Sequence, residues 1–411
     1  MSAHSIKENP PAMSDRARPL RVAVVATSLR LGGAEKQTVY SARALARAGI
    51  DVRFFYLGGG GYYENVLRQT GVPIRRIYTP NQPWLMLAGL TGSLCRLRPQ
   101  IVLAAQFGDL RYAAVAGRCC NALILGGVRS DGIYELNAHG RLGRWMARLA
   151  HGLVANSCRA RQNLVGRGIS SQKIEVLPNA IDLREFDERS ALPAGVFLPS
   201  DRVIVAAVGS LHPCKRFDRF LEALAVARRS EPALAGVIAG ADCGAKAELQ
   251  ARANRLGLAP HDLAFLGEVD RVPALLARAA LLVLTSDYEG FPNVILEAMA
   301  ARLPVISTSA GDAGLIVQHG ETGYVVEAED IQSMAAYMVQ LARSPSAKRN
   351  FGEAGRKRVE REYNCQLLAD RLVAVFHRFA RRQQRSSLCE LLERGVPATN
   401  PEAIPGAFIL G

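Results

Sequence analysis

The sequence predicts an α/β protein made of two Rossmann-like domains with a cleft between them. Short apolar stretches rich in β-branched residues alternate with stretches of helical length along almost the whole chain. Such alternation is typical of parallel sheets that carry helices on both faces. The alternation stops over the polar, Pro- and Gly-containing residues 186–201 and starts again at residue 203. A chain of 411 residues also suits two domains.

The first half of the chain contains seven predicted strands, with helices between most of them. We assign residues 20–185 to a first domain and residues 186–201 to a linker. Residues 1–19 lack the apolar stretch of a secretory signal, so we expect a disordered leader there. The predicted strands lie near residues 21–27, 51–57, 73–78, 101–105, 122–128, 152–156 and 173–177.

The second half repeats the alternation over residues 202–362, which we assign to a second domain. Residues 363–385 form a further predicted helix, and residues 386–411 form a separate tail. Three prolines, at positions 397, 401 and 405, argue against a long helix in that tail. The predicted strands lie near residues 203–208, 236–240, 263–266, 281–284, 304–307 and 323–326.

The most informative stretch is Glu-Gly-Phe-Pro-Asn-Val-Ile-Leu-Glu at residues 289–297. It follows a predicted strand and opens a predicted helix, so Glu289 stands at a strand tip and Glu297 one turn inside the helix. Asn293 is expected to cap that helix, with the first-turn N–H groups pointing into the gap. By spacing alone, two such glutamates indicate only a cap and a solvated helix face. Amides and carboxylates together suit a phosphorylated sugar.

In its strand–helix context this run closely resembles the signature of retaining nucleotide-sugar glycosyltransferases, specifically glycosyltransferase family 4. The resemblance extends over about residues 20–380 and implies the GT-B fold. In that fold the last helix, here Leu367 to Arg381, crosses back onto the first domain. Other stretches resemble the family's further blocks in the family's order: Leu31–Glu35, Val154–Ser157, Lys173–Asp182, Val208–Lys215, Phe265–Gly267 and Gly320–Val326.

The resemblance implies roles for the residues of the donor site. Lys215 would neutralise the leaving nucleoside diphosphate, because it follows a strand where ligands bind in open α/β sheets. Glu297 would accept hydrogen bonds from ribose hydroxyls. Glu289 would hold the transferred sugar and favour positive charge at its anomeric carbon. The intervening residues are candidates for contacts with sugar or phosphates: Gly290, Phe291, Pro292, Asn293 and Val294.

The phosphate site departs from the family in one detail. Gly32 and Gly33 form the expected glycine turn, which lets the backbone approach a phosphate closely. Relatives usually carry an arginine where this chain has Ser210. We expect Arg216 or His212 to supply the second positive charge.

Acceptor or sugar contacts are expected from the first domain. Many relatives carry a histidine after the fourth strand, where this chain has Gln106, which can bond a hydroxyl but cannot act as a base. Arg129 and Asp131 follow the next strand and are expected to face the cleft. Asn179 and Asp182 match the family's block at the domain junction, where a purely structural turn is the alternative.

The resemblance implies retention of anomeric configuration by front-face displacement, without a metal and with no cofactor beyond the nucleotide sugar. The sequence contains no Asp-x-Asp pair that would hold a divalent ion and no Cys-x-x-Cys pair. Catalysis would then rest on positioning and on stabilising the leaving group.

Charge is distributed unevenly along the chain. Residues 1–190 carry a net charge of +13 and residues 191–411 a net charge of +1. The basic half suggests an anionic surface: membrane lipid, a phosphorylated acceptor or nucleic acid. Residues 84–98 and 141–148 are basic and partly apolar, which fits helices resting on a bilayer or ordinary helices packed on the sheet. The chain lacks a nucleic-acid-binding motif, so nucleic acid is the weakest of the three.

We therefore expect a cytoplasmic hexosyltransferase-type enzyme that works at the cytoplasmic face of the inner membrane. It would move a sugar from a nucleoside diphosphate, preferably UDP, to a glycan or lipid-linked acceptor. Two alternatives stay open: a nucleotide-sugar epimerase on the same fold, and a non-catalytic binding protein that keeps the fold.

Overall fold

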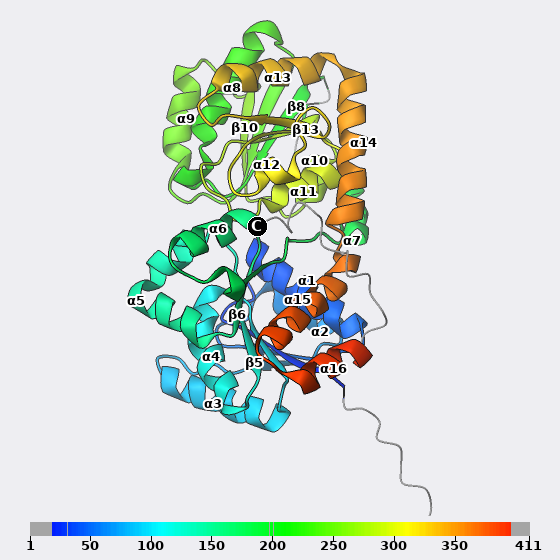
Figure 1. Cartoon of the computed structure of the whole chain (residues 1–411). Coiled ribbons are helices and arrows are strands. Elements are labelled where there is room, and N and C mark those ends of the chain that lie inside the picture. Colours follow the sequence, from blue (N-terminus) through cyan, green and yellow to red (C-terminus); the bar gives the residue numbers. More distant parts are fainter. Residues whose placement is uncertain (1–18, 31, 197, 200, 396–411) are drawn as a thin grey trace, which may run out of the picture.

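The computed structural model describes residues 19–395, apart from residues 31, 197 and 200. Two α/β domains lie end to end (Figure 1). The leader predicted over residues 1–19 lies outside the described residues except for Pro19, and so do residues 396–411 of the predicted tail.

The first domain holds a sheet of seven strands in the order β3-β2-β1-β4-β5-β6-β7. All seven predicted strands are confirmed, and every neighbouring pair is parallel. The strand order reverses between β1 and β4, which is where open α/β sheets bind ligands. The strands are β1 (Arg21–Ala26), β2 (Asp51–Tyr56), β3 (Ile74–Arg76), β4 (Ile101–Ala104), β5 (Leu123–Val128), β6 (Gly152–Ala155) and β7 (Ile174–Val176).

The second domain holds a sheet of six parallel strands in the order β10-β9-β8-β11-β12-β13. Its strand order reverses between β8 and β11. The six predicted strands are confirmed as β8 (Val203–Val208), β9 (Leu234–Ala239), β10 (Leu263–Gly267), β11 (Leu281–Leu284), β12 (Val305–Thr308) and β13 (Gly323–Val326).

Helices cover both faces of each sheet (Figure 1). The first domain carries α1 (Gly33–Arg47), α2 (Tyr62–Gln69), α3 (Pro83–Leu97), α4 (Leu110–Cys119), α5 (Ile133–Leu149) and α6 (Cys158–Gly166). The second domain carries α8 (Phe217–Ser230), α9 (Lys246–Arg255), α10 (Val272–Leu276), α11 (Asn293–Ala300), α12 (Ala313–Ile316), α13 (Ile331–Arg343) and α14 (Pro345–Glu362).

Strand alternation produces a hydrophobic core on each face of each sheet. On β1, Val22 and Val24 face one core, while Ala23 and Val25 face the other. All four are fully buried, as expected for a strand in the middle of a parallel sheet. Strand β8 behaves in the same way with Ala206 on one side and Val205 on the other.

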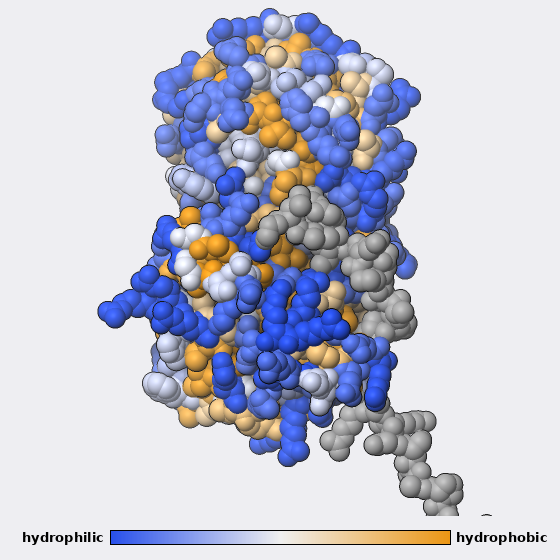
Figure 2. All heavy atoms as spheres, viewed as in Figure 1, coloured by the Kyte–Doolittle hydropathy of each residue, from blue (hydrophilic) through white to orange (hydrophobic). Residues whose placement is uncertain are grey.

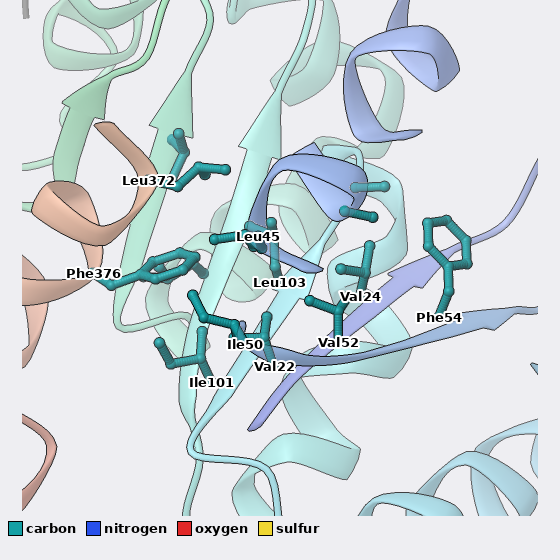
Figure 3. Packing of buried hydrophobic residues seen from close by; sticks show 14 of the residues in the cluster. Val22, Val24, Leu45, Ile50, Val52, Phe54, Ile101, Leu103, Leu372 and Phe376 are labelled. Atoms are coloured by element: carbon teal, nitrogen blue, oxygen red, sulfur yellow. The ribbon is translucent and has the colours of Figure 1, made fainter. Parts of the chain in front are cut away.

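The chain end crosses back to the first domain, as the resemblance implied. Helix α14 runs along the second domain toward the first, and α15 (Leu368–Arg382) then packs beside α1 (Figure 1). In α15, Leu372 and Phe376 point into the first-domain core near Leu45 and Ile101 (Figure 3). Phe376 has no exposed surface, so the first domain depends on residues from the far end of the chain.

Two segments differ from the sequence interpretation. Helix α7 (Leu183–Ser190) occupies the start of the stretch interpreted as a linker, because Asp182 caps it and Phe186 is buried against the second domain. The tail is not wholly separate either. Helix α16 (Ser386–Gly395) packs on α15 through Leu388 and Leu392. The sequence analysis did not predict this helix, because two leucines in a short segment are a weak helical pattern.

Candidate active site

A cavity of about 430 Å³ lies between the two domains, where both sheets reverse their strand order. The loop between β1 and α1 faces the loops that follow β8 and β11, because the carboxyl ends of parallel strands meet at one edge of each sheet. The cavity is lined from the first domain by Gly32, Gly33, Lys36 and Tyr63 and from the second by residues that include Ser210, Lys215, Glu289, Phe291, Pro292, Asn293, Val294 and Glu297.

Lys215 and Glu289 form an ion pair inside this cavity. Lys215 ends the single 3₁₀ turn η3 (Pro213–Lys215), and its Nζ lies 2.6 Å from Oε1 of Glu289. Ser286 Oγ donates to the same carboxylate oxygen at 2.7 Å. The two charged side chains are only 21% and 12% exposed, so the pair is held in a defined position at the edge of the cavity.

Glu297 meets a lysine of the other domain. It lies one turn inside α11, and its Oε1 is 3.0 Å from Nζ of Lys36, in the first turn of α1. The sequence analysis missed Lys36, although it directly follows the Gly-Gly-Ala-Glu block. The structure thus brings Lys215, Glu289 and Glu297 together, as expected, and adds a first-domain cation.

Asn293 is not the cap of α11, contrary to expectation. Pro292 occupies the cap position, and Asn293 is the first helical residue. Its side chain is turned away from its own helix, because Oδ1 accepts a hydrogen bond from Nδ2 of Asn179 at 2.8 Å across the domain boundary. Asn179 therefore has a structural role at the junction, and so does Asp182, which caps α7.

Glycines allow the two walls to come this close. A Cβ atom on Gly33 would lie 2.8 Å from Nδ2 of Asn293, and one on Gly290 would lie 2.6 Å from the carbonyl oxygen of Ser130. Both distances are too short for a methyl group. Gly33 has no left-handed backbone conformation, so approach rather than turn geometry requires glycine there.

Arg216 does not line the cavity. Its guanidinium bonds Asp218 and lies 3.2 Å from Asp287, and these carboxylates raise its pKa. His212 accepts a hydrogen bond from the backbone N–H of Cys214, so its ring serves the η3 turn. Among the described residues, Lys36 and Arg189 line the cavity as further cations besides Lys215, and Lys36 is the one that bonds Glu297.

A second cavity of about 490 Å³ lies within the first domain, beside the same seam. Gln106 and Arg129 line it, as the sequence analysis expected for acceptor contacts. Gln106 Nε2 donates to Glu35 Oε1 at 3.1 Å, and Arg129 Nε donates to the carbonyl oxygen of Ala105 at 3.3 Å. The sequence analysis missed Arg111 and His139, which also line the cavity from α4 and α5.

Asp131 lies apart from this cavity. Its carboxylate accepts from the backbone N–H of Tyr134 at 2.7 Å and so caps the first turn of α5. It lines a third cavity of about 330 Å³ between the domains, together with Arg159, Tyr288 and Glu289.

Asp312 joins the two domains on this side of the cleft. This second-domain carboxylate accepts hydrogen bonds from the backbone N–H groups of Cys158 and Arg159, at 2.7 and 3.0 Å. It thereby serves the N-terminus of α6, a helix of the first domain. Burial raises the pKa of Asp312, and the sequence analysis missed this contact.

Within the part of the chain that the structure describes, no group of three or more His, Cys, Asp or Glu side chains is placed to hold a metal ion. Over the same residues, none of the helices has the length and apolar composition needed to cross a bilayer.

Comparison with known families decides the membership of the chain. Residues 31–185 match the model of glycosyltransferase family 4, and residues 188–358 match the model of glycosyl transferases group 1. Together these matches span well over half of the chain. The chain belongs to glycosyltransferase family 4.

Known relatives of this family-4 chain match it in part. N-acetyl-alpha-D-glucosaminyl L-malate synthase of Bacillus anthracis is 35% identical over 28% of this chain and 30% of its own length. D-inositol 3-phosphate glycosyltransferase of Geodermatophilus obscurus is 30% identical over 60% of this chain and 56% of its own. The chain thus spans less than two thirds of the length of either relative.

The fold agrees with the family assignment. The crystal structure of Anabaena HepE in complex with UDP superposes with a TM-score of 0.74 at 20% identity, covering 90% of this chain and 100% of that one. The family-4 chain therefore has the GT-B fold, as its sequence predicted.

Proposed function

We propose that this protein is a retaining glycosyltransferase that moves a sugar from a UDP-linked donor to a glycan or lipid-linked acceptor. The observation that carries the proposal is the meeting of Lys215, Glu289 and Glu297 around one interdomain cavity. Crystal structures of HepE hold UDP and UDP-glucose, which supports a UDP-linked donor on this fold.

The geometry supports the donor roles that the family resemblance implies. Glu297 accepts hydrogen bonds from the ribose once Lys36 turns from it toward the diphosphate. Glu289 holds the sugar hydroxyls, and Ser286 fixes the carboxylate that does so. The backbone around Gly290, Phe291, Pro292 and Val294 forms the remaining wall of the donor site.

Bond cleavage places negative charge on the departing diphosphate. Lys215 stabilises that charge, and Lys36 is the second cation. Arg216 contributes indirectly, because its ion pair holds Asp287 in position. A preorganised donor to a developing anion contributes roughly 10²–10³-fold to kcat. The acceptor hydroxyl attacks from the face that the leaving group departs, and the departing phosphate takes its proton. The walls approach each other closely at Gly33 and Gly290, which narrows the cleft beside this site.

The proposed reaction needs no metal or other cofactor. The expected result is that transfer continues at an unchanged rate after dialysis against EDTA. A rate that falls with EDTA and returns with Mg²⁺ or Mn²⁺ would contradict metal independence without contradicting sugar transfer.

The acceptor binds to the first domain, which also contacts an anionic membrane face. Hydrophobic residues gather over α3 at the lower end of the molecule (Figure 2). Trp84 and Leu85 there are 78% and 56% exposed, and Arg76 lies over the ring of the exposed Tyr78. Trp145 is also exposed, but Met146 is buried, so α5 is in part an ordinary packed helix.

Trp84→Ser should weaken sedimentation of the protein with phosphatidylglycerol vesicles. Trp145→Ser tests whether that loss is specific to the α3 surface. This contact would place the enzyme at the cytoplasmic face of the inner membrane.

The deciding experiment screens UDP-, GDP- and ADP-sugars for thermal stabilisation and then follows the stabilising donor by NMR. Ligand binding to the native state raises the melting temperature by mass action. We expect release of nucleoside diphosphate with retention of the anomeric configuration. Glu289→Gln should abolish turnover, and Glu353→Gln, an exposed carboxylate paired with Arg302, should leave it unchanged.

Three results would overturn the proposal. Stabilisation by none of the nucleotide sugars would remove the donor site. Conversion of the donor to an epimer without diphosphate release would indicate an epimerase instead. Full turnover by Glu289→Gln would show that this carboxylate does not act on the sugar.

A further inference from the structure

Arg129 is the unusual charge of the first-domain cavity. Among the described residues no carboxylate pairs with its guanidinium, whose Nε donates to the carbonyl oxygen of Ala105. Burial is the cause that lowers its pKa to about 10. Arg129 is half-buried and lines the cavity, and a partly desolvated arginine without an anionic partner costs free energy, so such residues are usually paired or bind a ligand.

The carboxylates around this cavity are already engaged elsewhere. Glu135 accepts from the backbone N–H groups of Arg129, Ser130 and Gly132 and so holds the turn after β5. Asp109 accepts from the backbone and hydroxyl of Thr27 and from the backbone of Gln106.

The third carboxylate, Glu35, accepts from Gln106 Nε2. Within the described chain, no acidic side chain therefore stands opposite Arg129.

Two further side chains that can donate hydrogen bonds to an oxyanion line this cavity, the guanidinium of Arg111 and the imidazole of His139. Arg111 lines the same cavity and is exposed, with its guanidinium 5.0 Å from the ring centroid of Tyr112. His139 lines the opposite side from α5, close enough that a Cβ on Gly108 would lie 3.2 Å from its Nε2. Neither side chain forms an ion pair among the described residues.

The cavity also lies next to the proposed point of sugar transfer. Its residue Ser130 directly follows Arg129, and the carbonyl oxygen of Ser130 lies against Gly290 of the second domain. Gly290 in turn follows Glu289. A molecule in this cavity is therefore a near neighbour of a sugar held by Glu289.

We propose that the acceptor is acidic, and that Arg129 binds a phosphate or carboxylate group located near the hydroxyl that receives the sugar. The inference rests on the proposed function and names the chemistry of its acceptor. A guanidinium presents paired N–H donors that match both kinds of oxyanion. An anion would also supply the partner that Arg129 lacks.

The test uses the full-length protein with and without saturating UDP, which occupies the diphosphate site. Inorganic phosphate and acetate are titrated at constant ionic strength with chloride, and the melting temperature is followed. The variants are Arg129→Met, Arg129→Lys and a control, Arg118→Met. Arg118 also donates to a backbone carbonyl of the first domain, that of Leu149, but lies outside the cavity.

Phosphate or acetate should stabilise the UDP-bound protein. Arg129→Met should weaken the apparent affinity for the anion by at least about tenfold, the lower end for a lost charge-assisted bond. Arg129→Lys should retain part of the effect, and Arg118→Met all of it. Stabilisation by phosphate alone indicates a phosphorylated acceptor, and by acetate alone a carboxylated one.

The proposal is overturned if neither anion stabilises the protein, or if Arg129→Met responds as the wild type does. Arg129→Met should also be at least as stable as the wild type without ligand, because it removes an unpaired charge. UDP binding is a separate result. Its absence would count against the proposed donor, whereas the anion response of the Arg129 variants would still decide the acidic acceptor.

Discussion

The two walls of the cleft handle charge in different ways. On the second-domain wall, the charged groups are already paired, Lys215 with Glu289 and Glu297 with Lys36 of the first domain. On the first-domain wall, Arg129 faces a cavity and has no carboxylate partner among the residues that the structure describes.

Both walls are gathered from several loops. The run from Glu289 to Glu297 supplies part of the second-domain wall, and the ends of β8, β9 and β10 supply the rest, while the first-domain cavity is lined from the ends of β1, β4 and β5.

This difference teaches which part of the site is preorganised. Paired side chains hold the geometry that transfer chemistry needs before any ligand arrives. An unpaired arginine on a loop at a strand end is free to bind a ligand, and such loops can change their ligand without disturbing the sheet beneath them. We therefore expect substitutions on the second-domain wall to affect chemistry and those on the first-domain wall to affect acceptor choice.

The largest effect is expected from Lys215→Ala, which removes the cation nearest the leaving group. The kcat for sugar transfer should fall roughly 10²–10³-fold, with circular dichroism unchanged. Lys357→Ala, at an exposed position of α14, is the control for loss of a surface lysine. A variant that keeps its kcat and loses only donor affinity would reduce Lys215 to a binding residue.

Lys36→Ala tests a cation of the first wall that pairs with Glu297 of the second. Its pair with Glu297 is partly exposed, so unfolding free energy should change by at most about 1 kcal/mol. The donor kcat/KM should nevertheless fall about tenfold through loss of a charge-assisted contact. Steady-state kinetics at varied donor concentration distinguishes a donor contact from a purely structural ion pair. A purely structural pair would leave the donor KM unaltered.

Asp109 should make the first domain sensitive to pH. Burial raises its pKa from 3.8 to about 6, so the folded protein holds its proton more tightly than the unfolded chain. That contribution is fully present below about pH 4 and is lost as pH rises through about 6. Urea unfolding of wild type and Asp109→Asn between pH 4 and 8 should show this slope in the wild type only.

The difference between the two proteins is the relevant quantity, because His151 acts in the opposite direction. Burial lowers the pKa of His151 to about 4, which favours the fold as pH rises. Asp201→Asn, at an exposed position, controls for removal of a carboxylate. Parallel stability curves for wild type and Asp109→Asn would contradict the assignment.

The smallest effect is expected from Glu175→Gln. This residue joins the first domain to the returning helix α15 through Arg378 at 2.8 Å and Arg382 at 2.6 Å. The arginines are about one third exposed, so solvent screens the pairs and the loss should be at most about 1 kcal/mol in chemical denaturation. A larger loss would mean that charge, rather than the apolar contacts of Phe376, attaches the chain end to the first domain.

The part of the donor wall from Glu289 to Glu297 could be predicted from the sequence because its residues are close together along the chain. Glu289 and Glu297 belong to one strand–helix unit, and local rules place such residues at a strand tip and in a first turn. The same rules predicted every strand of both sheets, since burial on two faces leaves a continuous apolar run.

By itself, then, the sequence determined the strands, the two-domain fold and the residues that carry the family's signature. Only the tertiary structure decided that Lys36 rather than Arg216 reaches the cleft, that Asn293 bonds Asn179, and that Asp312 serves a helix of the other domain. These contacts join residues more than 100 positions apart. Their partners are chosen by how the two sheets meet, which no local pattern of residues encodes.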